Sequence, residues 1–151
     1  MKKIASFTVN HDTLEKGMYI SRIDGDVVTY DIRMKKPNGG DYLHMSAAHT
    51  LEHLFATYAR NSQYGDKIVY VGPMGCRTGF YLLTRDLAPE TVKNALKKAL
   101  ADTVAHEGGV FGATRKECGN YLDLDIDDAK RECAAYLAVL EKQNGGFDYA
   151  K

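Results

Sequence analysis

Residues 27–34 alternate between apolar and polar side chains, which is typical of a β-strand with one buried face. Two short apolar runs, 67–72 and 79–84, predict a second and a third strand. The segment 73–79 between them contains proline and glycine, so we expect a turn that joins them. The buried face of the first strand should carry Val28, Tyr30, Ile32 and Met34, and its open face should carry Thr29, Asp31 and Arg33.

Three segments carry apolar residues at helical spacing. The first covers 46–61, and we expect Ser46 to cap it. The second begins near Pro89, a residue favoured in the first turn of a helix, and should end by the Gly-Gly pair 108–109. The third should begin at a cap formed by Asp127 and end at the Asn-Gly-Gly sequence 144–146.

The strands come in pairs that short turns can join, and the helices are interspersed among them. This order favours an α+β fold, with a mostly antiparallel sheet packed against helices on one side. A length of 151 residues fits a single domain that spans 1–151. The 44% apolar and 26% charged residues are ordinary for a globular protein.

Lysine plus arginine and aspartate plus glutamate number 20 each, so the net charge is zero. A nucleic-acid-binding protein would show a basic excess, so no nucleic-acid partner is expected. The opening residues lack the apolar core of a signal peptide, and no apolar run reaches the roughly 18 residues that span a membrane. We therefore expect a cytoplasmic protein whose odd number of cysteines act as separate thiols.

Residues 49–53 read His-Thr-Leu-Glu-His, inside the first predicted helix. His49 and His53 lie four positions apart and thus project from one helix face, where two imidazoles can share a divalent ion. Glu52 flanks that face and can act as an acid or base beside the metal. The pattern is also a known zinc signature of inverted-motif peptidases. The plainer interpretation is a helix whose histidines simply bond to neighbouring groups.

A catalytic metal commonly has three protein ligands and one open position. Cys118 is the best candidate for the third ligand, because it stands beside a glycine in the irregular stretch 110–125, and thiolates suit zinc and iron(II). Taken alone, a cysteine there would more often be a small buried apolar residue. His11, His44 and His106 are weaker candidates, and His106 is better placed to interact with a helix C-terminus as a cation.

Cys76 belongs to the predicted turn between two strands, which would expose its thiol. The adjacent Arg77 favours the reactive thiolate form, although an incidental turn cysteine is an equally simple interpretation. Cys133, in contrast, falls on the apolar stripe of the last helix. We expect it to be a core residue.

Taken together, HTLEHL at 49–54, PMGCRTGFYL at 73–82 and ECG at 117–119 resemble S-ribosylhomocysteine lyase, the LuxS family. The segments YDIRM at 30–34 and SFTVNH at 6–11 resemble it as well. The resemblance implies a cytoplasmic homodimer with an α+β fold, with substrate pockets at the dimer interface and a catalytic Fe²⁺ that Zn²⁺ or Co²⁺ can replace.

By the matching motifs, His49, His53 and Cys118 would hold the metal, and Cys76 and Glu52 would be the acid–base catalysts. Arg33, Ser6 and His11 would contact the substrate. The implied reaction cleaves S-ribosylhomocysteine to homocysteine and 4,5-dihydroxy-2,3-pentanedione, the precursor of the quorum-sensing signal autoinducer-2. Two successive carbonyl shifts make a proton acidic, and β-elimination then expels homocysteine. Two positions depart from the family pattern at the amino-acid end of the pocket, Tyr70 and Thr29.

Two rival functions are an inverted-motif zinc peptidase and a non-catalytic metal-binding module. Such peptidases are usually much longer and take a downstream glutamate as third ligand. A purely structural metal site would be closed by four protein ligands. The number of protein ligands therefore discriminates between the module and an enzyme.

Overall fold

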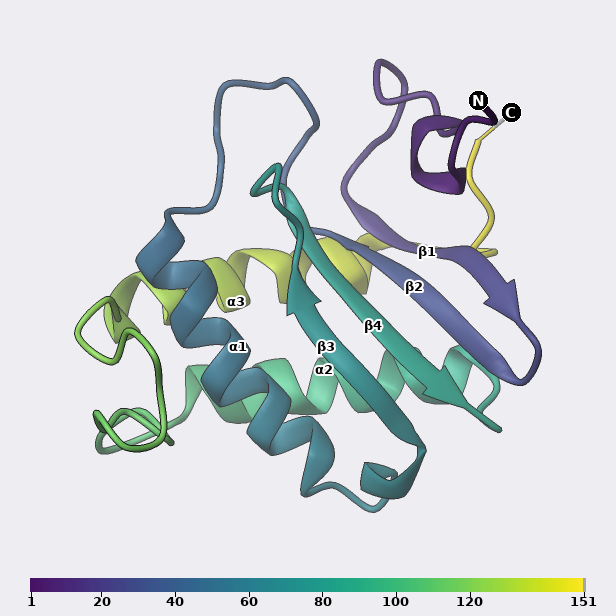
Figure 1. Cartoon of the computed structure of the whole chain (residues 1–151). Coiled ribbons are helices and arrows are strands. Elements are labelled where there is room, and N and C mark those ends of the chain that lie inside the picture. The colour runs from purple at the N-terminus through teal and green to yellow at the C-terminus, as the bar shows by residue number, and fades with distance from the viewer. Residues whose placement is uncertain (151) are drawn as a thin grey trace.

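A computed structural model describes residues 1–150, which form one four-stranded sheet and three α-helices (Figure 1). The strand order is β1-β2-β4-β3, and every neighbouring pair is antiparallel. The expected α+β class is thereby confirmed. The strands are β1 (Gly17–Asp24), β2 (Val27–Arg33), β3 (Ile68–Pro73) and β4 (Gly79–Arg85). The helices are α1 (Met45–Arg60), α2 (Pro89–Val104) and α3 (Ile126–Lys142), with 3₁₀ turns η1 (Ala5–Phe7) and η2 (Gly65–Lys67).

The core lies between one face of the sheet and the three helices (Figure 1). Alternate residues of the central strands point into it, as the period of two predicts. Cys133 is fully buried on α3, as expected of a core residue. No helix within residues 1–150 is long and apolar enough to span a membrane. The buried stripes of the sheet and the last two helices are formed by Tyr30, Ile32, Phe80, Leu82, Val92, Leu96, Ala99, Leu100, Ala129, Cys133, Tyr136 and Leu140.

The other face of β2 is more buried than its polar residues predict. Asp31 is only 1% exposed and Arg33 only 3%, so the expectation of an open face is wrong for these two residues. The N-terminal segment and the C-terminal tail lie together beside β1 (Figure 1), and Tyr149 of that tail bonds to Asp31. Segments distant in sequence thus cover the end of a strand whose own pattern indicates exposure.

Two predicted helix caps are wrong. Helix α3 is capped by Asp125 and not by Asp127. The Asp125 side chain accepts a hydrogen bond from the backbone N–H of Asp128 at 3.0 Å. Helix α1 begins one residue before Ser46, with His44 in the capping position and no side-chain capping bond. The backbone carbonyl of Ser46 instead accepts the Thr50 hydroxyl within the helix.

The second helix starts as predicted, with Pro89 in its first turn. It ends at Val104, before the Gly-Gly pair 108–109, as the sequence predicts. Between α2 and α3 the chain is irregular over 105–125. This long connection carries Cys118 toward α1.

Candidate metal centre

Helix α1 places His49 and His53 one turn apart on the same face, with their Nε2 atoms 3.1 Å from each other. The irregular connection brings Cys118 to them, and its Sγ lies 3.4 Å from His49 Nε2. The potential ligand atoms of the three residues, one from each, all lie within 4.8 Å of one another. The structure therefore assembles the three residues that the sequence motifs grouped.

Backbone carbonyls fix the orientation of both imidazoles. His49 Nδ1 lies 2.8 Å from the carbonyl oxygen of Asp123, and His53 Nδ1 lies 2.7 Å from that of Phe111. A carbonyl only accepts, so each Nδ1 must carry the proton in a neutral ring, which leaves each Nε2 as a bare lone pair. Two lone pairs facing each other at 3.1 Å repel, and a cation between them removes the repulsion.

The loop that holds His53 passes very close to its ring. Gly112 has φ of +68°, and a Cβ at this position would lie 3.2 Å from His53 Nδ1. Glycine is the residue that adopts this backbone conformation without cost and admits so close an approach. The loop is thus shaped around the imidazole that it orients.

An aromatic cluster anchors the same loop. Phe111 packs edge-on against Tyr58 and His106, with ring centroids 5.6 and 4.9 Å apart. His106 Nε2 bonds the Gly109 carbonyl at 2.8 Å, and its Nδ1 pairs with the Tyr58 hydroxyl at 2.7 Å. His106 therefore supports the His53 loop, and its ring does not bind the helix carbonyls as the sequence suggested.

The donor set fits a divalent transition metal. Two imidazole nitrogens and one thiolate suit zinc or iron(II), and the carbonyl partners of both rings are the supports that metal-binding histidines usually have. Within residues 1–150 the group contains three ligands, so a tetrahedral ion would keep one position open. A site of this kind is arranged for catalysis rather than for a closed structural role.

Glu52 lies beside this group without belonging to it. It is half-buried on α1 and lines an open hollow of about 570 Å³ together with His53 and Cys118. A carboxylate next to an open metal position can move protons to and from a bound substrate.

Cys76 occupies a second, smaller hollow of about 250 Å³, which His11, Tyr42 and Thr78 also line. The thiol is exposed, as its turn predicts. The following residue, Arg77, has φ of +61°, a conformation that costs a non-glycine residue roughly 1 kcal/mol or more. Hydrogen bonds from the Leu43 N–H to the Arg77 carbonyl and from the Arg77 N–H to the Met74 carbonyl hold the turn in this shape.

The remaining candidates are placed as follows. Arg33 is buried, and donates to Asp31 Oδ2 and to Thr78 Oγ1, both at 2.7 Å. Ser6 lies in η1 and lines neither hollow among the described residues. His44 precedes α1 and is exposed. Neither His44 nor His11 joins the metal group within residues 1–150.

Sequence reasoning missed several residues that shape the two hollows. The Oγ1 atom of Thr78 lies 3.0 Å from Cys76 Sγ. Thr78 belongs to the motif PMGCRTGFYL, so a hydroxyl two residues after the cysteine could have indicated this contact. The carbonyls of Phe111 and Asp123 left no signal, because any residue supplies a carbonyl. Tyr149, which contacts Asp31, carries no motif either.

Comparison with known proteins agrees with this geometry. The family S-Ribosylhomocysteinase (LuxS) matches residues 4–145. The chain is 50% identical over 148 residues to a protein of Phocaeicola vulgatus named S-ribosylhomocysteine lyase, with 93% of this chain and 92% of the relative covered. It is 46% identical over 147 residues to the protein of that name from Clostridium acetobutylicum, with 93% of each covered. The chain belongs to the S-ribosylhomocysteinase (LuxS) family.

Proposed function

We propose that the protein cleaves the thioether of S-ribosylhomocysteine, releasing homocysteine and 4,5-dihydroxy-2,3-pentanedione, the autoinducer-2 precursor. His49, His53 and Cys118 hold a divalent ion, Fe²⁺ in the cell, which Zn²⁺ or Co²⁺ can replace. The observation that carries this proposal is the convergence of two imidazole Nε2 atoms and one cysteine sulfur within 4.8 Å of one another, in a chain of this family.

The chemistry requires proton transfers at neighbouring carbons of the sugar. A divalent ion held by His49, His53 and Cys118 would supply Lewis acidity next to the sugar oxygens. Glu52 takes and returns protons from one side of the sugar, since it lines the hollow next to His53 and Cys118. Cys76 serves as the second acid–base group, because its exposed thiol opens on a hollow. After two carbonyl shifts, removal of the acidified proton expels homocysteine by β-elimination.

Three further residues are proposed to contact the substrate. His11 lines the hollow at Cys76 and is half-buried, so its ring is within reach of a sugar there. Ser6 is half-exposed on η1 and is available to a ligand that extends past this hollow. Arg33 donates to the Thr78 hydroxyl, and Thr78 lines the hollow at Cys76, which supports a place for Arg33 at the sugar end of the site.

We propose that the enzyme is a cytoplasmic homodimer with its active sites at the subunit interface. The hollows that contain Glu52 and Cys76 have no lining residue in common within residues 1–150, so a second copy would complete an enclosed site. The segment that carries Ser6 also exposes Ile4 and Phe7, the latter by 70%. Exposed large apolar side chains favour a protein contact. A fully active monomer in sedimentation and assay would contradict the dimer.

The function is tested with anaerobically purified protein, S-ribosylhomocysteine as substrate, and two measurements, bound metal and released thiol. Cys76→Ala and Glu52→Gln should keep the metal and lose turnover, whereas Cys118→Ala should lose both. Cys133→Ala is the matched control, because this thiol is buried in the core, away from both hollows. Turnover that survives in Cys76→Ala while metal is lost would show that the roles of the two cysteines are assigned wrongly.

A further inference from the structure

A continuous chain of polar contacts joins the C-terminal tail to the Cys76 thiol. The Tyr149 hydroxyl donates to Asp31 Oδ2 at 2.6 Å, and the same oxygen accepts from Arg33 Nη2 at 2.7 Å. Arg33 Nη1 donates to Thr78 Oγ1 at 2.7 Å, and Thr78 Oγ1 lies 3.0 Å from Cys76 Sγ. The tail and the reactive turn are thus two ends of one network.

The middle of this network is shielded from water. The side chains of Asp31 and Arg33 are 1% and 4% exposed, and Thr78 is also buried. At such sites hydrogen bonds are stronger than in water, and successive bonds polarise one another. Loss of a hydrogen bond at one end therefore alters the strength of the other bonds in the network. On the protein surface, water would screen this effect.

The direction of each hydrogen bond follows from the donors. A guanidinium has no acceptor, so Thr78 Oγ1 must accept from Arg33. The single hydroxyl hydrogen of Thr78 is then free to point at Cys76 Sγ. A hydrogen bond donated to sulfur favours the thiolate, which is the reactive form of a cysteine.

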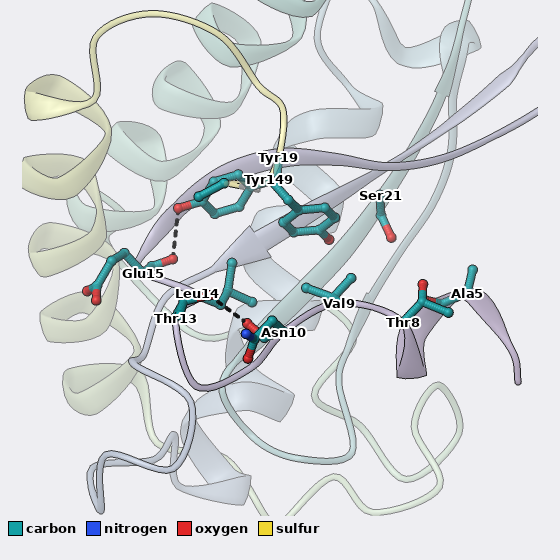
Figure 2. Close-up of a pocket in the computed structure, with 11 residues that line it drawn as sticks. Ala5, Thr8, Val9, Asn10, Thr13, Leu14, Glu15, Tyr19, Ser21 and Tyr149 are labelled. Carbon is teal, nitrogen blue, oxygen red and sulfur yellow. Dashed lines mark hydrogen bonds between the residues drawn. The ribbon is translucent and has the colours of Figure 1, made fainter.

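At the other end, Tyr149 acts as a donor. Burial, and after it the neighbouring Asp31 carboxylate, raises the pKa of Tyr149, so the phenol keeps its hydrogen at neutral pH. Its ring stacks on that of Tyr19, with the ring centroids 5.1 Å apart. Both residues line a hollow of about 440 Å³ between the tail and the N-terminal segment, and Figure 2 shows the two rings next to each other. Tyr149 thus both lines this hollow and contacts Asp31.

We propose that Tyr149 is a positioning residue which, through Asp31 and Arg33, holds the Thr78 hydroxyl against Cys76 and so keeps this thiol reactive. The inference rests on the proposed role of Cys76 and extends it to the C-terminal tail. Without the Tyr149 hydroxyl, Asp31 loses one of the two side-chain donors that residues 1–150 supply to it, and its hydrogen bond with Arg33 strengthens. The Arg33 contact that orients Thr78 is then weakened.

The test measures how fast iodoacetamide alkylates Cys76 at pH 7 in metal-loaded protein without substrate, with the Cys76 peptide quantified by mass spectrometry. Tyr149→Phe keeps the ring stack and removes the hydroxyl. We expect it to slow alkylation about threefold, the effect of one neutral hydrogen bond. Thr78→Val should slow alkylation similarly, and Thr78→Ser, which keeps the hydroxyl, should restore the wild-type rate.

Tyr19→Phe is the matched control, because it leaves the same stack intact and its hydroxyl bonds the Glu15 carbonyl instead of Asp31. It should alkylate at the wild-type rate. Wild-type rates in Tyr149→Phe or Thr78→Val, or equal slowing by Tyr19→Phe, would overturn the proposal. Because no substrate is present, a protein that fails to cleave S-ribosylhomocysteine still reports on the network, so the two proposals fail separately.

Discussion

His49 and His53 face each other through their Nε2 atoms at 3.1 Å, while the Nδ1 of each ring is bound to a backbone carbonyl. Because both Nδ1 atoms must donate, neither Nε2 of the neutral rings has a hydrogen to give to the other. The two lone pairs of the neutral rings therefore repel each other, and a divalent ion bound by both would remove that repulsion.

Metal binding should raise the stability of the folded chain. We expect the metal-loaded protein to exceed the chelated protein by about 3–4 kcal/mol in free energy of unfolding, when free metal is 100 to 1,000 times its dissociation constant. Thermal or urea unfolding with and without a chelator measures this difference.

His53→Ala should abolish most of the metal-dependent increase in stability. His44→Ala is the control for this experiment, since His44 is exposed just before the same helix and lies outside the metal group. A full metal-dependent increase in His53→Ala would exclude this residue as a ligand.

The aromatic cluster around His106 should influence metal affinity at a distance. Tyr58→Phe removes the hydroxyl that pairs with His106 Nδ1 and loosens the loop whose Phe111 carbonyl orients His53. Loss of a group bonded directly to a metal ligand typically weakens metal binding about tenfold or more, so this more distant change should weaken it by up to about tenfold. Competition with a colorimetric chelator measures the affinity. Tyr64→Phe, beyond the C-terminal end of α1, should bind metal like the wild type.

Cys133 should make the fold sensitive to alkali. Burial, with a smaller contribution from the Glu132 carboxylate, raises the pKa of Cys133 from 9.0 to about 12. Above pH 9 the unfolded chain releases this proton and the folded chain retains it, so stability falls as the pH rises toward 12. Between pH 9 and 10 the loss from this residue is about 1 kcal/mol.

The comparison that isolates Cys133 is the pH slope of urea unfolding in the wild type and in Cys133→Ala. The alanine variant should lose less stability over this interval, whatever its stability at neutral pH. The tyrosines with raised pKa values contribute equally to both proteins. Parallel slopes would show that the thiol ionises alike in the folded and unfolded chains.

Asp125 should stabilise α3 through its capping bond to the Asp128 N–H. Replacement of such a cap by alanine costs about 1 kcal/mol. Asp127→Ala, two residues later, should cost only about 0.3 kcal/mol through the helix dipole. Chemical denaturation of the two variants distinguishes them, and equal losses would contradict the assignment of the cap.

Local patterns were sufficient for most elements of this fold. Strand β2, the β3–β4 pair and the three helices follow from periods of two and 3.6 residues and from the punctuation by proline and glycine. Strand β1 was not predicted from the sequence, because a bulge between Ile20 and Arg22 interrupts its apolar–polar alternation and its outer residues are polar. An edge strand with such a bulge has no regular pattern to read.

The candidate site was predictable where it depends on residue type and not where it depends on packing. Helical spacing pairs His49 with His53, and the thiol chemistry of Cys118 makes it the natural third ligand. The burial of Asp31 and Arg33 was not predictable, since it depends on contacts with Tyr149 of the tail, which lies 118 positions away in sequence. The same holds for the carbonyls that orient the two imidazoles.

The distance in sequence between the ligands also sets an order of events during biosynthesis. His49 and Cys118 are 69 positions apart, so the histidine pair leaves the ribosome well before the thiol that joins it. The thiol meets the pair only after the 105–125 connection has settled against α1. A three-ligand site therefore exists only once this connection is in place, so metal binding would be coupled to the folding of residues 105–125 onto α1.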